Sequence, residues 1–206
     1  MADFIEPADA TRIAAAIRAT EAHTRAELVG VLTAESDDYL YVVLAWAAIL
    51  GLAAPFPWSL GLIEGPPAWA HGAALATTLA VLVLGRADAI RRLITPKSLM
   101  RRRAARNARA QFYEQRVRMT RDRAGVLLFV SVFEHHVEII ADEAAAAAVP
   151  AAVWQDAVDA LVAQVKAGDA PAGFLAAIEV LDKALTEYLP GDGSDQNELP
   201  NRLIIL

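Results

Sequence analysis

Two long apolar runs dominate the pattern of hydrophobic and polar positions along the chain. They cover residues 39–58 and 68–85, and between 39 and 85 there is no Lys or Arg and a single acidic residue, Glu64. A helix needs about 20 apolar residues to cross a bilayer, and the intervening SLGLIEGPP contains the Gly and Pro that end helices. The pattern predicts a transmembrane helical hairpin rather than the alternative, a helical pair buried in a soluble core.

Shorter patterns predict the remaining elements. They are a helix opening at Pro7 with Asp9 as its N-cap, strands over 26–34, 124–132 and 137–142, a basic helix over 97–119, and helices opening at Pro150 and Ala170. A lone helix and strand cannot bury their own apolar faces. The segment before the hairpin is therefore expected to fold with the segments after it into one α/β domain.

The predicted organisation has five parts. They are an N-terminal helix and strand (1–38), the transmembrane hairpin (39–85), a basic juxtamembrane helix (86–123), the remainder of the α/β domain (124–190), and a linker with an apolar tail that pins back onto the domain (191–206).

Charge predicts the orientation of the hairpin. The formal net charge is −6, yet residues 86–123 contain thirteen Lys and Arg residues against three acidic ones, and the loop inside the hairpin contains no basic residue. Basic residues are enriched in cytoplasmic segments next to membrane spans. Two spans with both termini in the cytoplasm are therefore predicted.

The basic helix is interpreted as a membrane-surface element. Its candidate contacts with anionic lipid headgroups are Arg101, Arg102, Arg103, Arg106 and Arg109. Arginine runs also bind nucleic acid, but this helix follows a membrane span closely and has no aromatic stacking platform beside it. The predicted partners are membrane lipid and a membrane protein complex, and no nucleic acid.

Candidate chemistry is limited to carboxylates. The chain has no Cys, and no nucleophile motif or phosphate-binding glycine loop is present; His135 and His136 are interpreted as a surface turn. Asp37 and Asp38 follow the first strand, and Asp142 follows the returning strand. If these strand ends meet, the three form an oxygen-only site for Ca²⁺ or Mg²⁺. The alternative is that the two N-terminal acids are solvated residues before a membrane span.

Two carboxylates lie inside predicted strands. Glu27 and Glu138 are expected to face solvent, as polar residues on the open face of a sheet do.

Three segments resemble the TPM domain family: RAELVGVLTAESDDY, RAGVLLFVSVFEHHVEIIADE and WQDAVDALVAQVKAGDAPAGFLAAIE. The resemblance implies an α/β/α sandwich around a small mixed sheet, here interrupted by the hairpin, and a bacterial inner (plasma) membrane location. Family members usually continue after the aspartate of the returning strand with Arg or Lys and then Gly. Here Asp142 is followed by Glu143 and five alanines, so a site built on that turn is in doubt.

Two functions follow from these observations. The favoured one is a membrane-anchored, cytoplasm-facing, non-catalytic module for the assembly or maintenance of a membrane complex. The alternative is a divalent-metal-dependent acid phosphatase, which the resemblance also implies. A phosphatase needs cationic groups at the transferring phosphoryl, and the parts of the chain outside the basic helix contain few; no catalytic residue is assigned.

Overall fold

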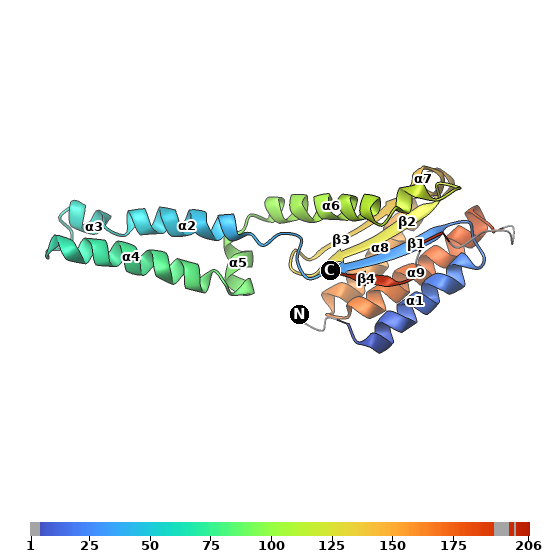
Figure 1. Ribbon diagram of the computed structural model, residues 1–206, viewed down its shortest axis with the longest axis horizontal. Helices are drawn as coiled ribbons and strands as arrows, with labels where there is room; N and C mark the ends of the chain where they lie inside the picture. The colour runs from blue at the N-terminus through green and yellow to red at the C-terminus, as the bar shows by residue number, and fades with distance from the viewer. Residues whose placement is uncertain (1–4, 192–197, 200) are drawn as a thin grey trace. The chain divides into compact units, whose positions relative to one another are not determined.

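The computed structural model describes residues 5–191, 198–199 and 201–206, and it consists of two compact units (Figure 1). The sandwich unit comprises Met1–Ser36 and Arg101–Leu206, and the hairpin unit comprises Asp37–Met100. The chain thus leaves the sandwich unit once and returns to it once, as an inserted segment does.

The sandwich unit holds helices on both sides of one sheet. Its elements are α1 (Pro7–Glu21), β1 (Glu27–Thr33), α6 (Lys97–Glu114, which begins in the hairpin unit), the 3₁₀ turn η1 (Val117–Met119), β2 (Gly125–Ser131), β3 (His136–Ala141), α7 (Glu143–Ala148), α8 (Ala151–Lys166), α9 (Ala170–Tyr188) and β4 (Leu203–Ile205).

The sheet is mixed, with the strand order β3-β2-β1-β4. β1 is parallel to both β2 and β4, and β3 is antiparallel to β2. All seven positions of β1 and of β2 are buried, because helices cover both faces of these central strands. The C-terminal tail, which was predicted to pack back onto the domain, forms the edge strand β4 and pairs with β1.

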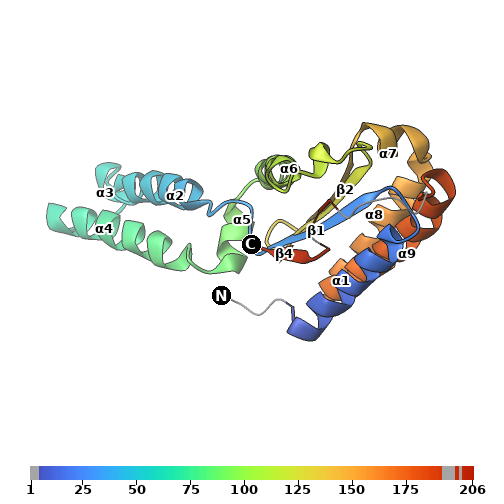
Figure 2. The same ribbon diagram turned by 45° about the vertical axis from the view of Figure 1, so that its right-hand side comes forward.

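One face of the sheet is covered by α1, α8 and α9 (Figure 2). Leu28, Leu32 and Leu128 point into this larger core, where Ile17 and Phe174 come from the helices. The alternation of side chains along a strand sends the intervening residues to the other face.

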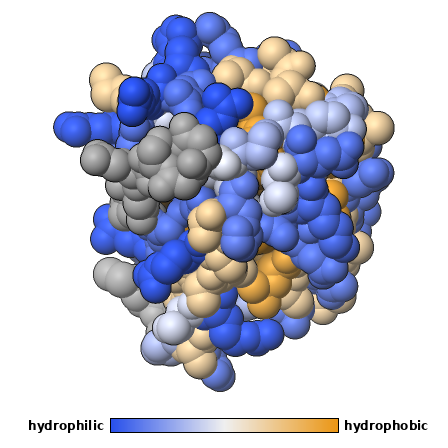
Figure 3. All heavy atoms as spheres, turned by 90° about the vertical axis from the view of Figure 1, so that its right-hand side faces the viewer, coloured by the Kyte–Doolittle hydropathy of each residue, from blue (hydrophilic) through white to orange (hydrophobic). Residues whose placement is uncertain are grey.

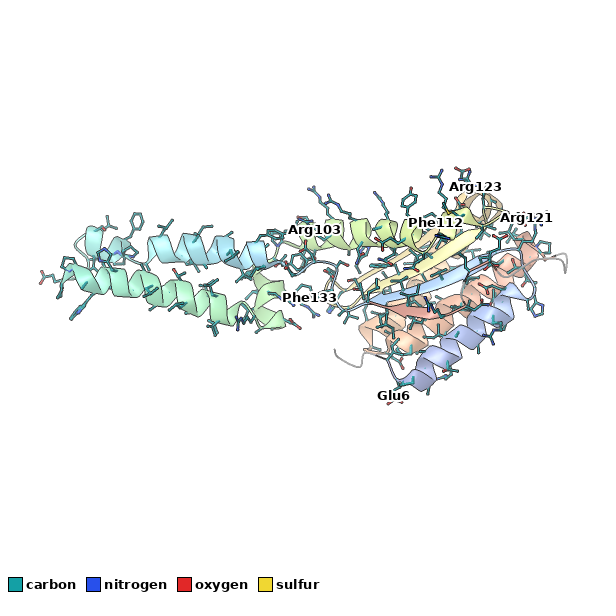
Figure 4. All side chains as sticks on the ribbon, viewed as in Figure 1. Glu6, Arg103, Phe112, Arg121, Arg123 and Phe133 are labelled. Carbon is teal, nitrogen blue, oxygen red and sulfur yellow. The ribbon has the colours of Figure 1, made fainter. Side chains whose placement is uncertain are left out.

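The other face is covered by α6. Val29, Val31 and Phe129 form a second core with Ala108 and Phe112 of that helix, and Figure 4 shows Phe112 pointing from α6 towards the strands. The basic helix, which the sequence placed in a segment of its own, is from Arg101 onward a layer of the sandwich. The predicted α/β/α sandwich around a small mixed sheet is confirmed.

The start of α1 differs from the prediction. The helix opens at Pro7 with Glu6 at the N-cap position. Asp9 lies in the first turn instead, where its carboxylate pairs with Arg12 at 3.0 Å. An acid in the first turn is favoured by the helix dipole. The sequence therefore predicted the start of the helix correctly but named the wrong residue as its N-cap.

The hairpin unit contains four helices: α2 (Leu40–Ala53), α3 (Phe56–Ser59), α4 (Pro67–Leu84) and α5 (Asp88–Ile94). Two helical segments, Leu40–Ser59 and Pro67–Leu84, are long and apolar enough to cross a membrane. Few side chains of the first and none of the second are buried, which is unlike the core helix of a soluble protein.

Candidate functional site

A buried polar cluster lies where β1 and β2 end. The parallel register places Thr33 beside Ser131, and the fully buried Ser131 donates its Oγ–H to Glu134. The backbone N–H of Ser36 donates to Glu134 Oε1 at 2.9 Å, and the Oγ atoms of Ser36 and Ser131 are 2.9 Å apart. Asn107 of α6 adds a longer contact from Nδ2 to Ser36 Oγ at 3.4 Å.

These contacts hold the residue at which the chain leaves the sandwich unit. Ser36 is bonded through both its backbone and its side chain, and Glu134, which holds it, is only 8% exposed. Buried polar groups are stable when they satisfy one another in this way. A catalytic serine needs a base that accepts its proton and an open path to substrate. Ser131 is fully buried, so its hydroxyl stabilises the polar cluster and is not open to a substrate.

The proposed metal ligands are not brought together at one end of the sheet. Because β3 runs antiparallel to β2, Asp142 lies beside the first residue of β2 and donates its backbone N–H to Gly125 O at 2.8 Å. Asp37 and Asp38 follow the opposite, carboxyl end of β1. The condition that these strand ends meet is not fulfilled, because a strand that returns alongside β2 has its carboxyl end at the opposite edge of the sheet from that of β1.

Each of the three acids has a local partner. Asp142 is 5% exposed, and its Oδ2 lies 3.5 Å from Arg123 Nε. Asp37 accepts from the N–H of Tyr39 at 3.3 Å, and Asp38 accepts from that of Leu40 at 3.0 Å. Within the described residues no group of three or more His, Asp or Glu side chains could hold a metal ion.

The surroundings of Asp142 explain the unusual sequence after it. Asp142 precedes α7, so the chain enters a helix here instead of a tight turn, and alanine is the strongest helix former. Arg123 also reaches Glu143 Oε1 at 3.1 Å. This end of the sandwich unit, near α7, presents a mostly hydrophilic surface (Figure 3), and the ion pairs there join β2 to α7.

The outer face of α6 is strongly basic. Arg101, Arg102, Arg106 and Arg109 are exposed, whereas Arg103 is half-buried. Arg102, Arg106, Arg109 and the exposed Tyr113 follow one another at helical spacing and form one stripe. We call Arg101, Arg102, Arg106 and Arg109 the basic face.

The basic face is not neutralised from within. In the described parts of the chain, none of its four guanidinium groups forms an ion pair, and the single acid of α6, Glu114, accepts a hydrogen bond from Gln111 at 2.8 Å. Like charges at i and i+4, such as Arg102 and Arg106, destabilise a helix by about 0.2–0.5 kcal/mol. Cations in the first turns also oppose the helix dipole. The basic face therefore does not serve the stability of α6.

Sequence reasoning missed two carboxylates, the buried Glu27 and the partly buried Glu21, that hold the C-terminal segment. Glu27 is 8% exposed, which corrects the expectation that it faces solvent, and it accepts from the N–H groups of Glu198 at 3.3 Å and Leu199 at 3.2 Å. Glu21 accepts from the N–H of Leu28 at 2.8 Å and from the side-chain amide of Asn201. We call Glu21 and Glu27 the carboxylate clamp.

The surroundings of Glu21 in the carboxylate clamp raise its pKa. Burial raises the pKa of Glu21 from 4.5 to about 8 and the charge of Glu27 adds to the rise, while hydrogen bonds from Leu28 and Asn201 and the charge of Arg18 oppose it.

Glu138, also expected to face solvent, is partly buried and pairs with His136 at 2.9 Å. No signal in the sequence marks these partners, because those of Glu27 lie more than 170 residues away.

A family model described as the TPM domain matches residues 89–184. Residues 89–184 belong to the TPM domain family. The match runs from α5 into α9. The elements α1, β1 and β4 lie outside the matched residues, although β1 and β4 belong to the same sheet as β2 and β3. No curated protein matches the chain.

A solved structure supports the fold of the TPM domain. The NMR structure of the BA42 protein from the psychrophilic bacterium Bizionia argentinensis is similar to this chain, with a TM-score of 0.63. The two are 19% identical, and the comparison covers 98% of this chain and 96% of that chain. At this identity the likeness concerns the fold alone.

Proposed function

We propose that this protein is a membrane-anchored TPM domain that lies on the cytoplasmic surface of a bacterial plasma membrane. In this proposal α2 and α4 cross the bilayer, and the domain acts as a non-catalytic module for the assembly or maintenance of a membrane complex. The basic face of α6 rests on anionic lipid headgroups.

The observation that carries the proposal is the exposed, unneutralised basic face on a helix that closely follows the hairpin. Each basic side chain near an anionic bilayer contributes about 1 kcal/mol, so four contribute about 4 kcal/mol.

The short connection between the sandwich unit and the hairpin also favours this contact. Leu40 begins α2 four residues after Ser36, a distance of at most about 14 Å, so an inserted hairpin would keep the domain near the surface at high effective concentration.

The polar groups of the domain favour a non-catalytic role. Ser131, Ser36 and Glu134 bond to one another, and Asp142 is paired with Arg123. The four exposed arginines of the basic face lie on an open helix surface, which suits a headgroup layer better than one enclosed phosphate. No observation of the described residues favours the phosphatase alternative, so it is kept only as an outcome to be measured.

The test measures how close α6 lies to lipid. Because the chain has no Cys, a single dye can be attached to a Tyr113→Cys variant of the full-length protein in nanodiscs, with a quencher on the lipid headgroups. We expect strong quenching in discs containing phosphatidylglycerol, weaker quenching in pure phosphatidylcholine, and loss of the difference in 0.5 M salt, where the screening length falls to a few Å.

Matched variants locate the effect. Replacing Arg101, Arg102, Arg106 and Arg109 with Gln should abolish the lipid dependence, whereas Arg12→Gln and Arg18→Gln, at exposed arginines of α1, should leave it intact. Equal quenching in both lipids, or quenching unaffected by the four substitutions on α6, would refute the proposed contact. Hydrolysis of a model phosphate ester that is lost in an Asp142→Asn variant would promote the phosphatase instead.

A further inference from the structure

The sheet of the sandwich unit ends in β3, whose outer side has no neighbouring strand among the described residues. In an antiparallel pair, alternate residues bond to the partner strand. Asp142 donates its N–H to Gly125 O at 2.8 Å, which fixes this alternation along β3. The backbone groups of Val137, Ile139 and Ala141 therefore point away from β2, and within the described residues they have no other backbone partner. We call these three residues the open edge.

β3 lacks the features that normally protect a free edge, which are Pro, Lys, a bulge or a very short strand. Its sequence HVEIIA contains neither Pro nor Lys, and its six residues pair with β2 in an unbroken register. Its one acid, Glu138, is paired with His136 at 2.9 Å. By contrast β4, at the other edge of the sheet, has only three residues. The open edge is therefore able to accept another strand.

The side chains of the open edge form an apolar row. Because they alternate along the strand with the other side chains of β3, Val137, Ile139 and Ala141 share one face of the sheet. They pack against the larger core and are partly exposed. A strand that paired with the open edge would cover this row best if its own residues on the same face were apolar.

The open edge is complementary to itself. When two identical strands pair antiparallel, a residue on the two-fold axis lies opposite its own counterpart. With Ile139 on the axis, Val137 of one copy lies opposite Ala141 of the other, so every outward backbone group is bonded and apolar side chains meet apolar ones. Moving the axis by one residue would leave Val137 or Ala141 opposite a residue outside β3.

We propose that two copies of this protein associate through β3, antiparallel and with Ile139 on the two-fold axis, so that one sheet continues through both sandwich units. A strand of a different protein would need a matching apolar row, whereas a second copy always carries one. The inference goes beyond the proposed function and does not depend on it, because the pairing uses residues of the sandwich unit alone.

A charge exchange at Ile139 tests the two-fold axis. The full-length protein is purified in detergent in two batches, with a donor or an acceptor dye at the N-terminus, and association is measured by energy transfer over a dilution series. Ile139→Lys and Ile139→Glu should each weaken association about a hundredfold, because like charges then face each other. Mixing the two variants should restore it. Ile205→Lys, at an exposed position of β4, should leave association unchanged.

Hydrogen exchange resolved at single residues locates the pairing without any substitution. In concentrated unmodified protein the N–H groups of Val137 and Ala141 should exchange slowly, and on dilution they should exchange faster. Those of Glu138 and Ile140 bond to β2 and should stay slow throughout. Slow exchange at Glu138 and Ile140 in the Ile139 variants also shows that their sheet is intact.

Several results would overturn the inference. One is a protein that stays monomeric at every concentration, and another is association that Ile139→Lys leaves unchanged, as contact through the hairpin would. Exchange at Val137 and Ala141 that is unaffected by dilution would show that the open edge does not pair with a second copy. Failure of the two charged variants to associate when mixed, with their sheets intact, would exclude Ile139 from the axis.

Discussion

At the scale of single residues, Glu21 makes folding depend on pH. Its pKa is about 8 in the folded protein against an ordinary 4.5, so between these values the folded state holds a proton that the unfolded state has lost. The free energy of unfolding should therefore fall as pH rises from about 4.5 to 8 and change no further through this group above that.

A substitution isolates this contribution. In Glu21→Gln the side chain no longer titrates, so the stability difference between the variant and the unmodified protein should grow in favour of the variant from pH 5 to pH 8. Urea unfolding in detergent, followed by the fluorescence of Trp154 in α8, measures it. Glu187→Gln, at an exposed position of α9, serves as the control; a pH-independent difference for Glu21→Gln would contradict the prediction.

At the scale of elements, β4 is a short edge strand that completes the sheet. Leu203 is 8% exposed and pairs with Gly30 of β1, whereas Ile205 at the end of β4 is 50% exposed. A Cβ built on Gly30 would lie 2.9 Å from Leu203 Cδ1. Backbone hydrogen bonds join the end of this segment to β1 as well, from Leu206 N–H to Leu32 O at 2.9 Å, but among the side chains of β4 only Leu203 is buried.

Leu203→Ala should destabilise the sandwich unit by about 2 kcal/mol, at the low end of the range for buried leucines because the site is at the sheet edge. Ile205→Ala should have little effect. Hydrogen exchange of peptides covering β1 should become faster in the first variant only. Equal protection in both variants would mean that β4 does not stabilise β1.

Sequence patterns predicted these elements with uneven success. The apolar runs marked β1, β2 and β3 to within a residue or two, because buried strands leave a strong local signal. The sequence also indicated that β3 returns alongside β2, so the place of Asp142 at the opposite edge of the sheet from Asp37 and Asp38 could have been predicted. The burial of Glu27, in contrast, follows from a C-terminal segment that the chain brings back from far away. The basic face could be predicted, because Ala104, Ala108 and Phe112 recur every four residues and mark the buried side of α6, which leaves the arginines on its other faces.

At the scale of the whole molecule, the distribution of basic residues predicts the topology. A fluorescent protein that matures only in the cytoplasm should fluoresce when fused after Leu206, and alkaline phosphatase inserted beside Glu64 should be active outside. The reason is the excess of Lys and Arg in residues 86–123 and their absence from the hairpin loop. A dark C-terminal fusion together with active C-terminal alkaline phosphatase would show the opposite orientation.

The insertion of the hairpin between β1 and its partner strand has a consequence for synthesis. Gly125, which begins β2, follows Thr33 by 92 residues, and a ribosome needs between about 5 and 20 s to add that many. Throughout this interval β1, apolar on both faces and open at both edges, has no strand to pair with. Under the proposed topology the hairpin leaves the ribosome first, so the nascent chain is already anchored when its central strand finds a partner. Its newly made β1 then depends on a chaperone or the ribosome surface for protection.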